Sequence, residues 1–194
     1  MEPGRAALGF RVKSGWAVVI LMNGSFRSPR LEDNCVIHLS DPRDPATRQP
    51  YHAVMGRLET NATKLKRRTE SVRRATTKSV VNLLKRYIDN GSTIRRAGLV
   101  VGSVIDPDSI ANPHIRAHAL EGQLFRTTLA ATLQSSGIGC SIFTERDAYL
   151  AAAKSLARSL EQIKRTIADL GHSRDGPWRA DQKLAAVAAW VSLR

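Results

Sequence analysis

The run Ala97–Ile105, with the sequence AGLVVGSVI, decides the fold class of this chain. It is mainly apolar and too short for most helices, so it predicts a buried strand. A second short run, Ile138–Thr144, predicts another buried strand. Between them, Asn112 as a cap and Pro113 in a first turn predict a helix that ends near Ser135. A helix of about 23 residues between two strands fits a right-handed crossover, so we expect both strands to lie parallel in one sheet.

The rest of the chain extends this pattern in both directions. Before the central run, the sequence predicts two strands joined by a turn, and then a helical period. After it, the sequence predicts two further helices. The expected elements are a strand Leu8–Met22, a turn Asn23–Ser25, a strand ending with Cys35–Leu39, a helical region from about Pro50 to Asn90, a helix Glu145–Leu170 and an amphipathic helix Asp181–Leu193. Whether residues 50–92 form one helix or two, with a break near Gly56 or Thr76, stays open.

These elements predict an α/β fold with a mixed, partly parallel sheet, flanking helices and the order β-β-α-β-α-β-α-α. We expect one domain over residues 1–194, with a basic helical segment at 50–92 and a C-terminal helix within 178–194. Apolar residues make up 42% of the chain, which is typical of a globular protein. The longest apolar run, Ala17–Met22, is far shorter than the roughly 20 residues of a membrane span. The N-terminus does not resemble a secretion signal, so we expect a cytoplasmic protein. Cys35 and Cys140 are interpreted as small core residues.

The charge of the chain points to a polyanionic partner. Lys and Arg number 30 against 17 Asp and Glu, a formal net charge of +13, and much of the excess lies between Arg57 and Arg96. Nucleic acid, bound through its phosphates with little sequence preference, is the partner this pattern favours, and DNA and RNA are both open. A solvated helix face that only keeps the protein dissolved is the alternative. The candidate phosphate contacts are Lys64, Arg67, Arg68, Arg73, Arg74 and Lys78.

Three segments resemble the ribonuclease H-like superfamily, in particular Holliday-junction resolvases of the RuvC type. Leu8–Ile20, LGFRVKSGWAVVI, resembles that family's first hairpin. Glu121–Arg126, continuing to Gly137 and Ile138, resembles its central helix and the strand that follows. Asp147–Ala153, DAYLAAA, resembles the start of its last helix, which carries a metal-binding carboxylate. The resemblance implies a ribonuclease H-like fold.

The carboxylates of the family's two-metal nuclease are mostly missing. The resemblance implies an Asp on the first strand, where this chain has Arg11, Lys13 and Ser14. It also implies a Glu on the middle strand, near Ser103 or Val104. Only Asp147 matches a family ligand, and two-metal hydrolysis needs several hard oxygen ligands. The sequence therefore favours the fold over the nuclease activity, which is uncertain or lost.

A polar stripe lies on the helix after Asn112. His114, His118 and Glu121 fall within about 60° of arc on a helix, beside its apolar face. Asp106 and Asp108 lie just before this helix, at the carboxyl end of the middle strand, where open α/β sheets usually bind ligands. We predict a pocket formed by the stripe with Asp106 or Asp108. It could bind a divalent metal, which is the one cofactor considered, or supply a general base. A purely structural set of polar contacts is the alternative.

A second polar cluster lies in the loop SDPRDPATRQPYH. Its side chains include Asp41, Asp44, Arg48, Tyr51 and His52. Prolines fix such a loop, and fixed polar loops often carry function. A rigid connector into the following helix is the alternative interpretation.

Three function classes follow from these features. The first is a ribonuclease H-like nucleic-acid-binding protein. The second is a hydrolase that uses His114, His118 and Glu121 with Asp106 and Asp147. The third is a non-catalytic protein that docks an acidic partner, and a homodimer is a further open expectation.

Overall fold

A computed structural model describes residues 5–53, 56–172 and 176–194 of the chain. Its centre is a five-stranded sheet of β1 (Arg5–Lys13), β2 (Trp16–Ser25), β3 (Ser28–His38), β4 (Thr93–Val101) and β5 (Gly139–Thr144), in the order β3-β2-β1-β4-β5. The pairs β1–β2 and β2–β3 are antiparallel, and β1–β4 and β4–β5 are parallel. The predicted common sheet, with the two later strands parallel, is confirmed.

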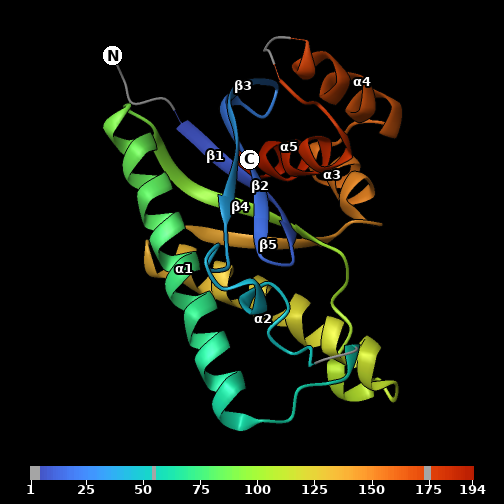
Figure 1. The fold of residues 1–194 in the computed structure, drawn as a ribbon. Coiled ribbons are helices and arrows are strands. Elements are labelled where there is room, and N and C mark those ends of the chain that lie inside the picture. The colour runs from blue at the N-terminus through green and yellow to red at the C-terminus, as the bar shows by residue number, and fades with distance from the viewer. Residues whose placement is uncertain (1–4, 54–55, 173–175) are drawn as a thin grey trace.

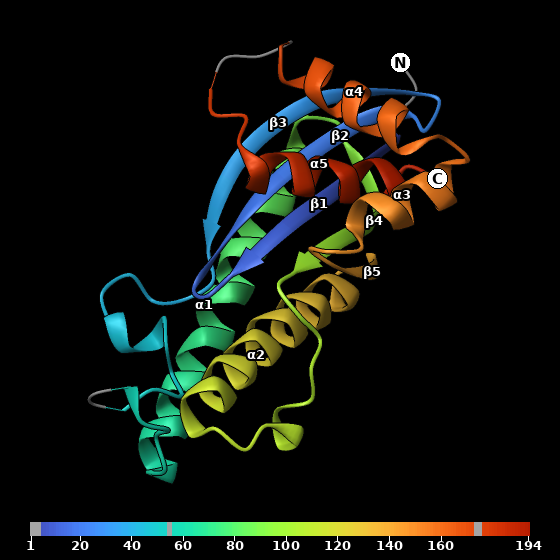
Figure 2. The same cartoon turned by 90° about the vertical axis from the view of Figure 1, so that its right-hand side faces the viewer.

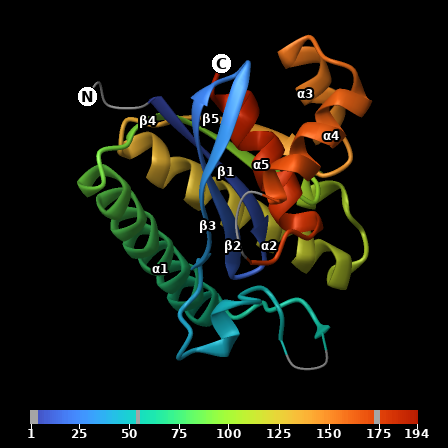
Figure 3. The same ribbon diagram turned by 90° about the horizontal axis from the view of Figure 1, so that it is seen from above.

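Helices cover both faces of this sheet (Figure 1). On one face lie α1 (Ala62–Asp89) and α2 (Pro113–Ser135), which run side by side and extend beyond the sheet (Figure 2). On the other face lie α3 (Ala148–Leu156), α4 (Leu160–Gly171) and α5 (Ala180–Ser192) (Figure 3). Each face has its own apolar core. Among the described residues, no helix is long and apolar enough to cross a membrane.

The first two predicted strands are three strands in the structure. The predicted strand Leu8–Met22 is interrupted at Gly15, whose φ of +85° lies in the left-handed region that favours glycine. The chain reverses there between β1 and β2. The predicted turn at Asn23–Ser25 was wrong, because these residues pair with Ser28–Arg30 and the reversal falls at Phe26 and Arg27. Apolar residues on both sides of Lys13–Gly15 led to the prediction of one strand instead of two. Asn23-Gly24 is a typical hairpin-turn sequence, but here it lies within a paired strand.

The basic segment forms one helix that begins later than predicted. Asn61 caps α1 by accepting a hydrogen bond from the backbone N–H of Lys64, and α1 then continues for 28 residues without a break at Thr76. The described residues between 50 and 60, predicted as helical, lie outside the α-helix, and an isolated bridge pairs His52 with Leu58. We call residues 50–53 and 56–60 the loop before α1. In this loop the backbone of Glu59 bonds to the carbonyl of Tyr51 at 2.8 Å.

The predicted long helix Glu145–Leu170 is two helices. Ala157 adopts φ +53°, which ends α3, and Ser159 caps α4 with a complete capping box. Ala-rich composition predicts helix on both sides of such a break and cannot show the break itself. The following helix, α5, was predicted as amphipathic, but it is the central helix of its layer and most of its residues are buried.

The two parallel strands at the sheet edge also differ in detail from the prediction. β4 ends at Val101, so residues 102–105 lie beyond the strand. β5 is an edge strand, and Ile142 is 45% exposed, so the prediction of a fully buried strand was wrong. Cys35 and Cys140 are both free and only partly buried.

Candidate functional site

The carboxyl ends of the parallel strands β1 and β4 lie at one edge of the sheet, where α/β proteins usually bind ligands. A cavity of about 240 Å³ lies at this edge. Arg11 and Lys13 line it from β1, Gly102 and Ser103 from the segment after β4, and His118 from α2. We call it the carboxyl-edge cavity.

Arg11 occupies the β1 position at which the resemblance implied a metal-binding carboxylate. Its side chain is only 3% exposed and forms ion pairs with Glu145 and Asp181. Lys13 adds a second cation 3.1 Å from the same Asp181 carboxylate. A guanidinium is an obligate cation with no lone pair for a metal. The carboxylates at this point of the sheet are therefore used as counter-ions of a buried arginine.

Asp181 is a residue that the sequence interpretation did not select. It lies in the first turn of α5, and this helix, not α3, is the one that packs across the centre of the sheet. The sequence signal for its role was its place just before Leu184–Ala189, a stretch rich in alanine that can pack closely on a sheet. Asp147 has local contacts instead. Its carboxylate accepts a 2.6 Å hydrogen bond from Thr144, and this bond lowers the pKa of Asp147.

Three histidines meet at the start of α2, and one of them, His118, also lines the carboxyl-edge cavity. His114 and His118 lie on the first turns of α2, and His52 reaches them from the loop before α1. The ring centroids are 4.4 Å apart for His52–His118, 4.7 Å for His114–His118 and 5.2 Å for His52–His114. The structure therefore unites the predicted helical stripe with one residue of the predicted polar loop.

Glu121 lies beneath these rings. It is fully buried, and its Oε1 accepts a hydrogen bond of 2.7 Å from Nδ1 of His52. Its Oε2 is 3.6 Å from Nδ1 of His118, beyond hydrogen-bond distance. Burial raises the pKa of Glu121, and burial together with the two neighbouring histidines lowers the pKa of His118. We call His52, His114, His118 and Glu121 the histidine cluster.

The predicted partners Asp106 and Asp108 do not join this cluster. Asp106 caps the short 3-10 helix η3 (Pro107–Ser109), and Asp108 pairs with Arg116. Within the described residues, neither aspartate forms a hydrogen bond or ion pair with His114 or His118. The predicted pocket with these aspartates is therefore not formed, because η3 turns their carboxylates toward its own backbone and Arg116.

The structure divides the predicted basic contacts on α1 into two groups. Lys64, Arg67, Arg73, Arg74 and Lys78 are exposed. Arg68 is different, because its side chain is only 13% exposed and donates to the carbonyls of Pro50 and His52. It also pairs with Glu59 at 3.4 Å. Arg68, which the sequence suggested as a phosphate contact, thus holds the loop that carries His52.

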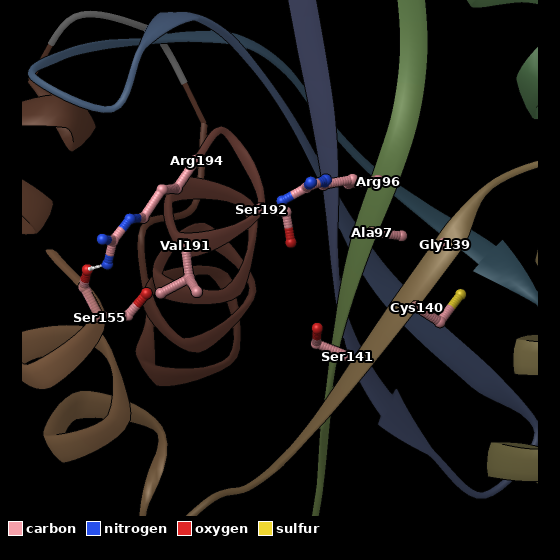
Figure 4. A pocket seen from close by; sticks show the side chains of 9 residues that line it. All are labelled: Arg96, Ala97, Gly139, Cys140, Ser141, Ser155, Val191, Ser192 and Arg194. Carbon is pink, nitrogen blue, oxygen red and sulfur yellow. Dashed lines mark hydrogen bonds between the residues drawn. The ribbon is translucent and has the colours of Figure 1, made fainter.

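A further cavity, of about 520 Å³, opens on the α5 side of β4 and β5 (Figure 4). Arg96 points across it toward Ser192, and Arg194 donates to the carbonyl of Ser155. Cys140 points away from α5 in this view. The lining comes from the amino-terminal halves of the two strands, so this cavity lies away from the edge at which the fold usually binds ligands.

Comparison with known proteins gives a result only at the level of structure. No protein-family model and no curated protein matches the chain. Among solved structures, Thermus thermophilus RuvC in complex with a Holliday junction substrate is similar with a TM-score of 0.54 at 10% identity, over 96% of this chain and 91% of that chain. A second structure of Thermus thermophilus RuvC gives a TM-score of 0.53 at 10% identity, over 96% and 92% of the two chains.

The sheet order, the two helical layers and these similarities together define the class of fold. The chain has a ribonuclease H-like α/β fold. Within that class, its arrangement is of the RuvC type.

Proposed function

We propose that this chain binds nucleic acid through the phosphate backbone along the exposed face of α1, without two-metal hydrolysis at the carboxyl edge of the sheet. The observation that carries the proposal is a row of four basic side chains, Arg67, Arg74, Lys78 and Lys85, which we call the α1 ridge. They are spaced by seven, four and seven residues, so all four project within about 20° of one direction on a helix. That direction is opposite to the buried side chains of α1, among them Val72 and Val80.

The α1 ridge has the length and exposure that a phosphate-binding surface needs. From Arg67 to Lys85 it spans about 27 Å at the rise of an α-helix. Arg67 is 69% exposed and Lys85 is 73% exposed. Their acidic neighbours, Asp44 at 4.0 Å and Asp89 at 3.1 Å, form surface pairs, and such pairs are weak enough to exchange for phosphate.

Support for a nucleic-acid ligand also comes from the similar structure. The RuvC that this chain resembles was solved with a Holliday junction substrate. The ribonuclease H-like fold can therefore present a surface to branched DNA. Aromatic residues make up only 5% of this chain, so base stacking contributes little and backbone contact is the favoured mode.

The absence of two-metal hydrolysis follows from Arg11. Its buried guanidinium stands at the end of β1 between Glu145 and Asp181, and it neutralises the carboxylates that would have to hold metal ions. We therefore expect binding of duplex and branched DNA with no Mg²⁺- or Mn²⁺-dependent cleavage. The hydrolase alternative of the sequence analysis stays a prediction, and the same samples test it.

The experiment compares two triple variants of equal charge. The ridge variant carries Arg67→Glu, Arg74→Glu and Lys78→Glu. The control variant carries Lys154→Glu, Lys164→Glu and Arg165→Glu, at exposed positions on α3 and α4 across the sheet. Binding of a labelled duplex and a four-way junction is measured over a range of salt concentrations. We expect the ridge variant to lose affinity by about tenfold or more and to reduce the slope of log K against log salt by about 3.

The control variant distinguishes an effect of the α1 ridge on DNA binding from an effect of the net charge. Both variants lower the net charge equally. The control variant should nevertheless keep most of the affinity, because its three positions lie away from the α1 ridge. Equal losses in the two variants, with circular dichroism unchanged, would contradict the proposed surface. Cleavage of the DNA on addition of Mg²⁺ or Mn²⁺ would contradict the proposed loss of hydrolysis.

A further inference from the structure

In two rings of the histidine cluster, one nitrogen is held by a hydrogen bond and, within the described residues, the other is not. Nδ1 of His52 donates to the buried carboxylate of Glu121, and Nδ1 of His114 donates to the carbonyl of Gly56 at 2.9 Å. Each of these rings therefore has its Nδ1 anchored and its Nε2 left as the unprotonated nitrogen. An oxygen acceptor that fixes one ring nitrogen while the other is presented is the arrangement seen in metal-binding histidines.

His52 supplies the second, independent observation. Its side chain is only 9% exposed, and its Nε2 is buried without any hydrogen-bond partner in the structure. A buried polar nitrogen without a partner is unfavourable. Among the described residues, the rings of His114 and His118 pack against it, and one nitrogen of each lies close to a ring nitrogen of His52.

The spacing of these nitrogens suits a small cation. One ring nitrogen from each of His52, His114 and His118 lies within 4.8 Å of the other two. Tetrahedral zinc, at about 2.0–2.1 Å from each nitrogen, needs its ligand atoms about 3.3 Å apart. Rotation of the exposed His118, whose ring lies 3.6 Å from Glu121 and is not held by that contact, reduces the difference. His52 stays fixed by Glu121 and by the contact of Arg68 with its carbonyl.

We propose that His52, His114 and His118 bind one divalent cation of the zinc class through their ring nitrogens, with Glu121 orienting His52 from behind. Imidazole ligands suit zinc and its transition-metal neighbours, whereas Mg²⁺ and Ca²⁺ prefer oxygen. Three protein ligands leave a fourth position for water or another small ligand. This position lies on the solvent side, where His118 is 48% exposed.

Such a cation would connect two parts of the fold that are distant in sequence. His52 belongs to the loop before α1, and His114 and His118 belong to the start of α2. Binding therefore fastens the loop to α2 at the end of the helices that extends beyond the sheet (Figure 2). The site is independent of the α1 ridge, so either proposal can fail without the other.

The test uses the full chain without a histidine tag, stripped of metal by a chelator and dialysed. Zinc is titrated by calorimetry, and bound metal is quantified after gel filtration. We expect one equivalent of zinc, unaffected by excess Mg²⁺. Cobalt in place of zinc should give the visible absorption of tetrahedral Co²⁺ with nitrogen ligands and should be displaced by zinc.

Substitutions then locate the site. His118→Ala and His114→Ala should each lower zinc affinity at least a hundredfold, and Glu121→Gln should lower it about 10–100-fold by weakening the orientation of His52. The matched control, His38→Ala, removes an exposed histidine on β3 and should leave affinity unchanged. Failure of the wild-type chain to retain zinc, or equal retention by the His114/His118 double alanine variant, would overturn the proposal. Because the cobalt spectrum is recorded on the wild-type chain, the proposal remains testable if a variant fails to fold.

Discussion

Glu121 and the residues around it illustrate how one buried carboxylate organises polar groups at the surface. Its side chain is fully buried, and its Oε1 accepts a hydrogen bond from Nδ1 of His52. His118 lies on the same face of α2 as Glu121 but is half exposed. Its Nδ1 is 3.6 Å from the other carboxylate oxygen, which is too far for a hydrogen bond. The two histidines therefore differ in how much the fold depends on them, although both face the same space.

Alanine substitutions of these two histidines should separate structure from ligand binding. His52→Ala removes the 2.7 Å hydrogen bond of the buried Glu121, so we expect the free energy of unfolding to fall by about 1–3 kcal/mol in chelator. His118→Ala should change it by less than about 0.5 kcal/mol, because the ring is solvated. Urea unfolding followed by circular dichroism measures both. A larger loss for His118→Ala than for His52→Ala would show that the assigned roles are reversed.

At the scale of elements, α5 packs closely against the sheet. Gly9 on β1 and Gly98 on β4 are neighbours in register, and both face the backbone of α5. A Cβ atom on Gly98 would lie 2.7 Å from the carbonyl oxygen of Ala188, and one on Gly9 would overlap the carbonyl of Ala185. The two glycines and the alanines of α5 therefore set how near the helix approaches, and so where Asp181 meets Arg11.

Glycine-to-alanine substitutions should test this contact. Gly9→Ala would push the backbone of α5 away from β1, so we expect the free energy of unfolding to fall by about 3 kcal/mol or more. The matched control is Gly122→Ala, in the middle of α2, where a Cβ meets no atom within 4 Å. It should stabilise by about 0.5–1 kcal/mol through helix propensity. Thermal unfolding of both variants gives the comparison, and a neutral Gly9→Ala would mean that α5 packs less closely than described.

At the scale of the whole molecule, a cation at the histidine cluster would change global stability. A ligand that binds only the folded state stabilises it according to its concentration and affinity. The cluster joins residues 52 and 118, which are far apart in the sequence and lie in different elements. Binding there cannot persist in an unfolded chain.

Zinc should therefore raise the unfolding temperature of the wild-type chain. At a free concentration a hundred times Kd, the stabilisation is about 2.7 kcal/mol, which corresponds to roughly 5–11 °C for a domain of this size. Differential scanning fluorimetry with and without zinc measures the shift, and EDTA should reverse it. The same shift in His118→Ala would place the cation elsewhere on the molecule.

The sequence by itself determined the class of fold and the character of its surface. Two short apolar runs separated by one capped helix indicated a parallel crossover, because a strand–helix–strand unit is the usual connection between parallel neighbours in one sheet. Asn112 and Pro113 marked the start of α2 correctly, since capping is decided within a few residues. The basic excess between Arg57 and Arg96 likewise needed only the sequence, because charge is a property of composition.

Tertiary structure decided which of these side chains share a site. His52 and Glu121 are 69 residues apart in the sequence. They come within 2.7 Å because His52 lies in the loop before α1, where helical periodicity had predicted a helix. Arg68 has the same sequence context as Arg67, yet it points into that loop while Arg67 points to solvent. Arg11 could be seen to replace a carboxylate, but its partners Glu145 and Asp181 come from the ends of β5 and the start of α5. Such contacts depend on how layers pack, and neither periodicity nor spacing along the chain contains that information.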